Sequence, residues 1–215
     1  MTEVVKPWQM ISYSLAGLFF SCFTLADTIL VTDRTGKPVA NAVVSTITND
    51  KKAAKAATAI MDQKNKNFVP HVLVVEAGQA VSFPNSDNIR HHVYSFSKPN
   101  QFEIKLYSGK SSAPQVFNHA GIVTLGCNIH DQMKGYIYVT DGEAANVSGT
   151  DGLVELPTAT GFVHAWHPDL EGDVTERLKL PLQKRNATGQ WQITLPFEAT
   201  EPSPGKGYNF RDRFR

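Results

Sequence analysis

Short runs of β-branched and aromatic residues alternate with glycine, proline, asparagine and serine along most of the chain. Such runs are typical of strands, and no amphipathic pattern of helical period and useful length competes with them. The predicted strands comprise two within residues 28–48, followed by 72–75, 80–83, 92–96, 102–106, 115–117, 121–125, 136–139, 153–156, 161–166, 178–180 and 190–195. Many short strands at close spacing favour an all-β fold built as an antiparallel β-sandwich.

Three segments interrupt this pattern. Residues 49–59 are rich in Lys and Ala and are expected to form a short helix or a linker. Residues 142–152 show no strand pattern and are expected to form a loose connection. The end, residues 201–215, combines Pro and Gly with basic and aromatic side chains. We expect this end to be a flexible tail.

Residues 1–26 have the layout of a secretory signal peptide. A short head containing Lys6 leads into an apolar run that ends in small residues at Ala26, and the chain turns polar at Asp27. An uncleaved anchor is the alternative, although the run is short for crossing a bilayer. We expect export, removal of residues 1–26 and no stable membrane insertion afterwards.

The charges are nearly balanced, with 21 Lys and Arg against 20 Asp and Glu and a net charge of +1. Nucleic acids and anionic membranes select clustered basic side chains, so neither is an expected partner. The two cysteines are Cys22 and Cys127, and signal cleavage removes the first. Because a lone thiol in an oxidising compartment is open to oxidation, Cys127 is expected to be either buried or bound to a metal.

A compact group of metal-binding residue types follows the strand predicted at 121–125. Cys127, His130 and Met133 are spaced three residues apart and precede the strand predicted at 136–139. Thiolate, imidazole and thioether are the ligands of a blue-copper site, in which two His and one Cys form a plane and a Met lies on the axis. Zinc accepts Cys and His but has little use for a thioether.

Such a site needs a second histidine, and the pair His91 and His92 offers two candidates. The spacing from Asn85 favours His91, whereas strand alternation groups His92 with the side chains two and four residues further on. Neighbouring positions of one strand cannot both point inward. We take His91 as the ligand and keep His92 as the alternative.

These residues carry a resemblance to the cupredoxins, the plastocyanin and amicyanin group. The Cys-x₂-His-x₂-Met loop is similar to the short amicyanin loop, and Phe83-x-Asn85-x-Asp87-x₃-His91 resembles the strand and loop that lead to the first copper histidine. The resemblance covers about residues 60–140. It implies His91, Cys127 and His130 as equatorial ligands and Met133 as the axial ligand.

The flanks resemble carboxypeptidase-regulatory-like, or prealbumin-type, sandwiches. The motif Val31-Thr-Asp-x-x-Gly-Lys-Pro38 looks like their opening strands, and residues 150–168 look like their later ones. The organisation is similar to that of bacterial methylamine-utilization-like proteins. It implies a cupredoxin Greek-key β-sandwich at residues 58–141 and a second, small prealbumin-like or Ig-like β-sandwich formed by residues 27–50 and 142–200.

The resemblance implies a periplasmic type 1 (blue) copper protein that carries single electrons by cycling between Cu(I) and Cu(II). Its partner would be a redox protein such as a cytochrome or a periplasmic oxidoreductase. The alternative is a copper-binding storage, delivery or sensing protein without a carrier role. We do not expect an enzyme, because the remaining histidines, at 71, 119, 164 and 167, form no convincing second cluster in the sequence.

Gln63 is a further candidate near the metal. It precedes the first predicted cupredoxin strand and could serve as a neighbour of the ligands or as an alternative axial oxygen ligand. A polar residue at the start of a strand is the simpler explanation.

Overall fold

A computed structural model of the protein describes residues 26–47, 57–109, 113–157 and 161–199. Every regular element within these ranges is a β-strand, which confirms the all-β prediction. No helix in the same ranges is long and apolar enough to cross a membrane. The predicted signal peptide up to residue 25, with Cys22, lies outside the described residues, as do most of the Lys/Ala-rich segment and the tail at 201–215.

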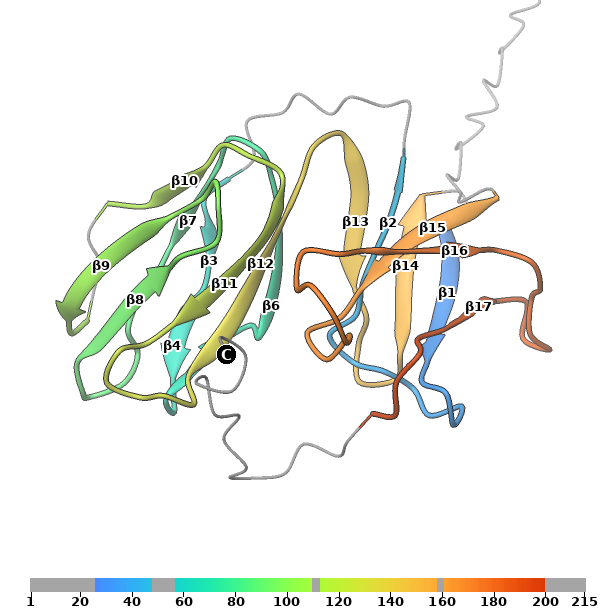
Figure 1. The fold of residues 1–215 in the computed structure, drawn as a ribbon, viewed down its shortest axis with the longest axis horizontal. Coiled ribbons are helices and arrows are strands. Elements are labelled where there is room, and N and C mark those ends of the chain that lie inside the picture. The colour runs from blue at the N-terminus through green and yellow to red at the C-terminus, as the bar shows by residue number, and fades with distance from the viewer. Residues whose placement is uncertain (1–25, 48–56, 110–112, 158–160, 200–215) are drawn as a thin grey trace, which may run out of the picture.

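The middle of the chain forms a β-sandwich, on the left in Figure 1. A five-stranded sheet in the order β6-β12-β11-β8-β9 packs on a three-stranded sheet in the order β10-β7-β3, and the hairpin β4-β5 lies at one end. The strands are β3 (Ala59–Ile60), β4 (Asp62–Lys64), β5 (Asn67–Val69), β6 (Val72–Glu76), β7 (Gln79–Ser82), β8 (His91–Ser95), β9 (Phe102–Tyr107), β10 (Gln115–Phe117), β11 (Gly121–Gly126) and β12 (Lys134–Thr140). Phe68, Phe83, Phe117, Leu125 and Ile137 are buried between the sheets.

The two ends of the described chain form a second sandwich, on the right in Figure 1. One sheet has the order β14-β1-β17 and the other the order β13-β2-β15-β16. The strands are β1 (Ala26–Thr32), β2 (Val43–Ile47), β13 (Glu143–Val147), β14 (Leu153–Pro157), β15 (Phe162–Trp166), β16 (Leu178–Pro181) and β17 (Trp191–Thr194). Segments more than a hundred residues apart are thereby joined, since β1 pairs with both β14 and β17.

The segment predicted to be loose, residues 142–152, is partly a strand. Residues Glu143–Val147 form β13, which pairs antiparallel with β2 from Glu143 opposite Ile47 to Val147 opposite Val43. The sequence Glu-Ala-Ala-Asn-Val has weak intrinsic strand propensity. The ladder with β2 therefore determines its conformation, and this pairing could not be anticipated from the local pattern.

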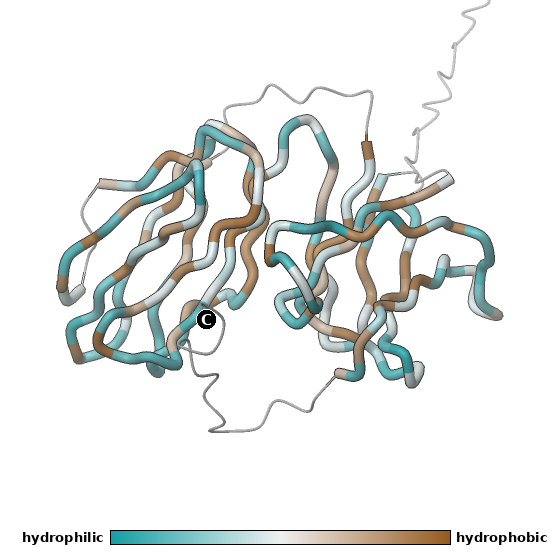
Figure 2. Tube along the Cα trace, in the orientation of Figure 1, coloured by the Kyte–Doolittle hydropathy of each residue, from teal (hydrophilic) through white to brown (hydrophobic). Residues whose placement is uncertain are grey.

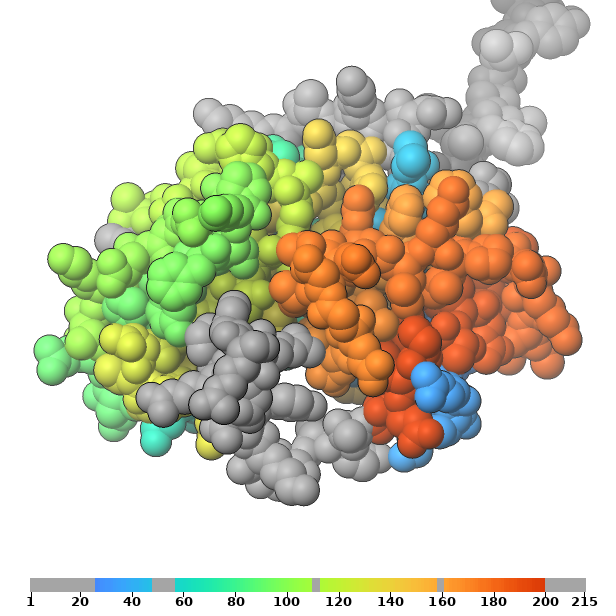
Figure 3. Space-filling view, in the orientation of Figure 1, coloured from blue at the N-terminus to red at the C-terminus, as the bar shows by residue number. Residues whose placement is uncertain are grey.

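Strand β12 is buried on both faces and connects the two sandwiches. Ile137 and Val139 point into the first core, whereas Tyr136 and Tyr138 alternate to the opposite face, as strand geometry requires. The ring centroids of Tyr136 and Tyr138 lie 5.4 and 6.3 Å from that of Trp166 on β15. Hydrophobic stretches lie in both halves of the trace in Figure 2, and the two halves are in contact in the space-filling view of Figure 3.

His167, directly after β15, is buried as a neutral imidazole. Its Nδ1 accepts a hydrogen bond from the Asp169 amide at 3.1 Å, so its Nε2 carries the proton and donates to the Ala40 carbonyl at 3.0 Å. Burial is the largest influence on the pKa of His167 and lowers it below 6.5, against the opposing effects of Asp169 and Ala40. Protonating Nδ1 in the folded protein would break the hydrogen bond that this atom accepts from the Asp169 amide.

The stability of the metal-free protein should therefore fall as the pH is lowered. A histidine whose pKa is lower in the folded than in the unfolded state stabilises fully above the unfolded value of about 6.5, and this contribution is lost as the pH falls below it. Urea unfolding from about pH 7.5 to about pH 5 measures this dependence. In His167→Gln, whose amide can keep both hydrogen bonds, the dependence should be weaker, and an identical slope would contradict the prediction.

Candidate metal centre

The loop between β11 and β12 turns Cys127, His130 and Met133 towards one another. β11 and β12 are antiparallel neighbours, and the loop between them contains two tight turns. The amide of His130 donates to the Cys127 carbonyl at 3.4 Å, and the amide of Met133 donates to the His130 carbonyl at 2.8 Å. Cys127 and Met133 are buried at 3% and 1% exposure, whereas His130 is half-buried. The loop thus presents two sulfur atoms to the interior and one imidazole near the surface.

His91 completes a compact group of nitrogen and sulfur atoms. Cys127 Sγ lies 3.8 Å from Nδ1 of His91 and 3.7 Å from Nδ1 of His130. The candidate ligand atoms of the three residues all lie within 4.8 Å of one another. Among the described residues, this is the group of His, Cys and acidic side chains whose spacing suits a metal ion.

The neighbouring histidine, His92, is turned away from this group. Its Nε2 lies 2.9 Å from Glu103 Oε1 on β9, and its ring centroid lies 5.5 Å from that of Tyr94, with the two rings tilted by 46°. A register irregularity in the β8–β9 ladder falls between His91 and Val93. Strand β8 also begins at His91, one residue earlier than predicted. Both histidines are buried, but on opposite faces of the strand.

Met133 lines the same small cavity as Cys127, together with Tyr94 and Gly126. A Cβ atom at Gly126 would lie 2.7 Å from Cζ of Tyr94, so a larger residue there would displace the end of the Tyr94 side chain. All four residues predicted from the sequence are therefore gathered at one end of the first sandwich.

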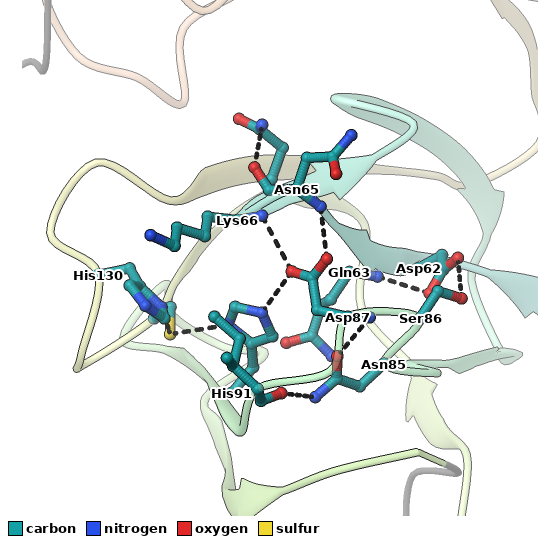
Figure 4. A network of polar contacts seen from close by, with 12 residues as sticks. Asp62, Gln63, Asn65, Lys66, Asn85, Ser86, Asp87, His91 and His130 are labelled. Carbon is teal, nitrogen blue, oxygen red and sulfur yellow. Dashed lines mark hydrogen bonds and ion pairs between the residues drawn. The ribbon is translucent and has the colours of Figure 1, made fainter. Parts of the chain in front are cut away.

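Asp87 orients the imidazole of His91. Its Oδ2 lies 2.7 Å from Nε2 of His91, as Figure 4 shows. Although burial alone would raise the pKa of Asp87, the amides of Lys66 and Asn65 and the contact with His91 hold it below its ordinary value. An ionised carboxylate only accepts hydrogen bonds, so Nε2 of His91 carries a proton, and Nδ1 is the ring nitrogen that faces the thiol. Carboxylate partners of this kind orient metal-binding histidines.

The β4–β5 hairpin holds Asp87 in place. The amides of Asn65 and Lys66, at its tip, donate to the two carboxylate oxygens at 2.7 and 3.0 Å (Figure 4). Both residues have left-handed backbone angles, with φ of 54° and 59°. This hairpin is absent from the strands predicted from the sequence, because its two strands of three residues, Asp-Gln-Lys and Asn-Phe-Val, are mostly polar and poor in β-branched residues. The Asn at position 65, a residue type that tolerates this conformation, was the available signal.

The surroundings of the half-buried His130 favour its neutral form. Burial, followed by the charges of His91 and Lys66, lowers the pKa of His130. The donors available are thus two imidazole Nδ1 atoms, 3.8 and 3.7 Å from a buried thiol, and a nearby thioether. This mixture of soft and borderline donors fits copper better than zinc, magnesium or calcium.

No protein-family model matches the sequence, and no curated protein matches it significantly. Among solved structures, a purple cupredoxin from Nitrosopumilus maritimus is 20% identical and similar to this chain with a TM-score of 0.34, over 40% of this chain and 100% of its own. Amicyanin from Paracoccus versutus is 20% identical with a TM-score of 0.35, over 45% and 97%. A copper-containing nitrite reductase from Thermus scotoductus is 23% identical with a TM-score of 0.38, over 52% of this chain and 28% of its own.

Proposed function

We propose that the protein is an exported single-electron carrier with a type 1 copper site, in which His91, Cys127, His130 and Met133 would hold the ion. The observation that carries this proposal is the position of Cys127 Sγ between two imidazole Nδ1 atoms, at 3.8 and 3.7 Å. Copper, when bound, would supply the one-electron chemistry between Cu(I) and Cu(II). The protein supplies the donor set, its orientation and its surroundings.

The fold supports fast electron exchange by holding the donors in advance. Cys127 and Met133 belong to the same apolar core as Phe68 and Leu125, which excludes water from one side of the site. Asp87 fixes the rotation of the His91 ring. Donors held by packing and by hydrogen bonds move little when the charge of a bound ion changes, and the apolar surroundings set the redox potential.

The surface around His130 supports docking of a redox partner. His130 is the half-buried member of the ligand set, and the adjacent Ile129 is 48% exposed. We propose that a partner such as a cytochrome or a periplasmic oxidoreductase docks over this histidine. The apolar N-terminal run, with Ala26 at its end, supports export to the periplasm.

Reconstituting residues 27–215 with Cu(II) tests the proposal. A carrier of this type is expected to show an intense thiolate-to-copper band in the visible spectrum and a narrow copper hyperfine splitting in EPR. It should also be reduced and reoxidised reversibly. A colourless protein that retains only Cu(I) would reject the carrier role in favour of copper storage or delivery.

A further inference from the structure

Gln63, in strand β4, is a polar side chain in the interior of the first sandwich. It is 0% exposed and is among the largest fully buried side chains of the described chain. Its backbone is bridged to Asn85, and its carbonyl accepts a hydrogen bond from the amide of Ser86 at 3.0 Å. Gln63 is thereby attached to the loop that carries Asp87 and leads to His91.

Hydrogen bonds determine which way the carboxamide of Gln63 faces. Its Nε2 donates to the carbonyl of Pro84 at 3.2 Å and to the hydroxyl of Tyr107. The Tyr107 hydroxyl in turn donates to the carbonyl of Phe83 at 2.5 Å, so it can only accept from Gln63. A flipped amide would set Oε1 against the Pro84 carbonyl oxygen, and both groups are acceptors. The position of Oε1 is therefore settled by its neighbours.

The amide oxygen itself has no donor. Oε1 of Gln63 is fully buried and has no hydrogen-bond partner among the described residues. Burying an acceptor without a partner forfeits the hydrogen bond that it makes with water in the unfolded chain. Such an atom in an otherwise well-bonded side chain points to a missing ligand or a buried water molecule.

The side chain of Gln63 is connected to the candidate metal ligands through Tyr107. Tyr107, which binds the amide group of Gln63, pairs with His91 across the β8–β9 ladder. The pKa of Tyr107 is raised to about 12, mainly by burial, and the charge of Cys127 contributes to the shift. Figure 4 shows Gln63 in one network with Asn85, to which its backbone is bridged, and Asp87, which binds His91.

We propose that Oε1 of Gln63 is an additional, oxygen ligand of the ion held by His91, Cys127 and His130. This proposal rests on the proposed copper site and deepens it. An amide oxygen is a harder donor than a thioether, so it favours Cu(II) over Cu(I). Besides closing the coordination sphere, Gln63 would thus lower the reduction potential of the site.

Cobalt(II) provides a test that does not depend on electron-transfer activity. In the Co(II)-loaded protein, the side-chain protons of Gln63 are expected among the strongly hyperfine-shifted NMR signals. These signals should vanish in Gln63→Leu. The control variant Tyr107→Phe removes one hydrogen bond of the same amide but leaves Oε1 in place, and it should retain them.

The copper-loaded protein provides the second measurement. In Gln63→Leu the ratio of the Cu(II) to the Cu(I) affinity should fall about tenfold, which corresponds to a rise of about 59 mV in the reduction potential of a one-electron couple. Unshifted Gln63 protons together with an unchanged potential would overturn the proposal and assign Oε1 to a buried water. If the unaltered protein forms no thiolate-to-metal band with either ion, the copper site itself is rejected, and the Gln63 ligand with it.

Discussion

Replacing His91 by glutamine is expected to abolish the thiolate-to-copper band of the reconstituted protein, whereas the same replacement of His92 is expected to leave it nearly unchanged. His91 directs Nδ1 at the Cys127 thiol from 3.8 Å, while His92 is bound to Glu103 on the other face of β8. The two variants remove the same chemical group from adjacent positions. Their visible and EPR spectra therefore separate a ligand from a structural histidine.

Cys127→Ser provides the reference for complete loss, because the band requires the thiolate. Circular dichroism of each metal-free variant establishes that the fold is retained. The assignment of His91 would be wrong if His92→Gln lost the band while His91→Gln kept it. It would also be wrong if both variants kept it.

Replacing Trp166 by alanine is expected to lower the free energy of unfolding by about 3–5 kcal/mol, the usual cost of truncating a large buried aromatic residue. Trp166 is 1% exposed and lies against Tyr136 and Tyr138, which come from the other sandwich. Its Nε1 donates to the Val174 carbonyl at 2.8 Å. Urea unfolding, followed by fluorescence and circular dichroism, measures the loss.

Trp191→Ala is the matched control. Trp191 is only half-buried and packs under the guanidinium of Arg185 at 4.2 Å, so its truncation should cost clearly less. Because Trp166 connects the two sandwiches, its loss is also expected to broaden the transition or divide it in two. Equal losses in the two variants would show that the junction contributes no more than the surface.

The stability of the junction matters to the proposed function because strand β12 belongs to both cores. The strand leads away from Met133 and carries Ile137 into the first core and Tyr136 into the second. The five-stranded sheet that contains β12 also contains β8 and β11, next to which the candidate ligands lie. The second sandwich covers one face of this sheet. The strand that follows the candidate ligand loop is therefore packed on both faces, which holds the loop in place for a protein that docks near His130.

Local patterns identified most of the strands correctly. Alternating β-branched and aromatic residues identified β6, β9, β11 and most of β12 to within two residues, because a strand of five to seven residues carries its own period of two. The strands that were missed, β3 to β5 and β13, are two or three residues long or poor in strand-forming residues. The ladders of β3 with β7 and of β13 with β2 supply their conformation, and β4 and β5 pair with each other.

The same distinction applies to the candidate site. Cys127, His130 and Met133 could be identified from their spacing, because a seven-residue loop between two strands can bring only neighbouring residues together. Spacing could not decide whether His91 or His92 is the ligand. The answer depends on where β8 begins and on the irregularity of its ladder with β9. Asp87 was noted as part of a motif, and its role follows only from its contact with the imidazole.

The sequence by itself determined the all-β class, the cysteine that stands alone after Ala26, and a loop with the donor types of a copper site. Only the tertiary structure decided which histidine faces the thiol and which way the Gln63 amide oxygen faces. The physical reason is the range of the contacts. Periodicity and ligand spacing act over a few residues, whereas Cys127 meets His91, and Gln63 meets Tyr107, across strands 36 and 44 residues apart in the chain.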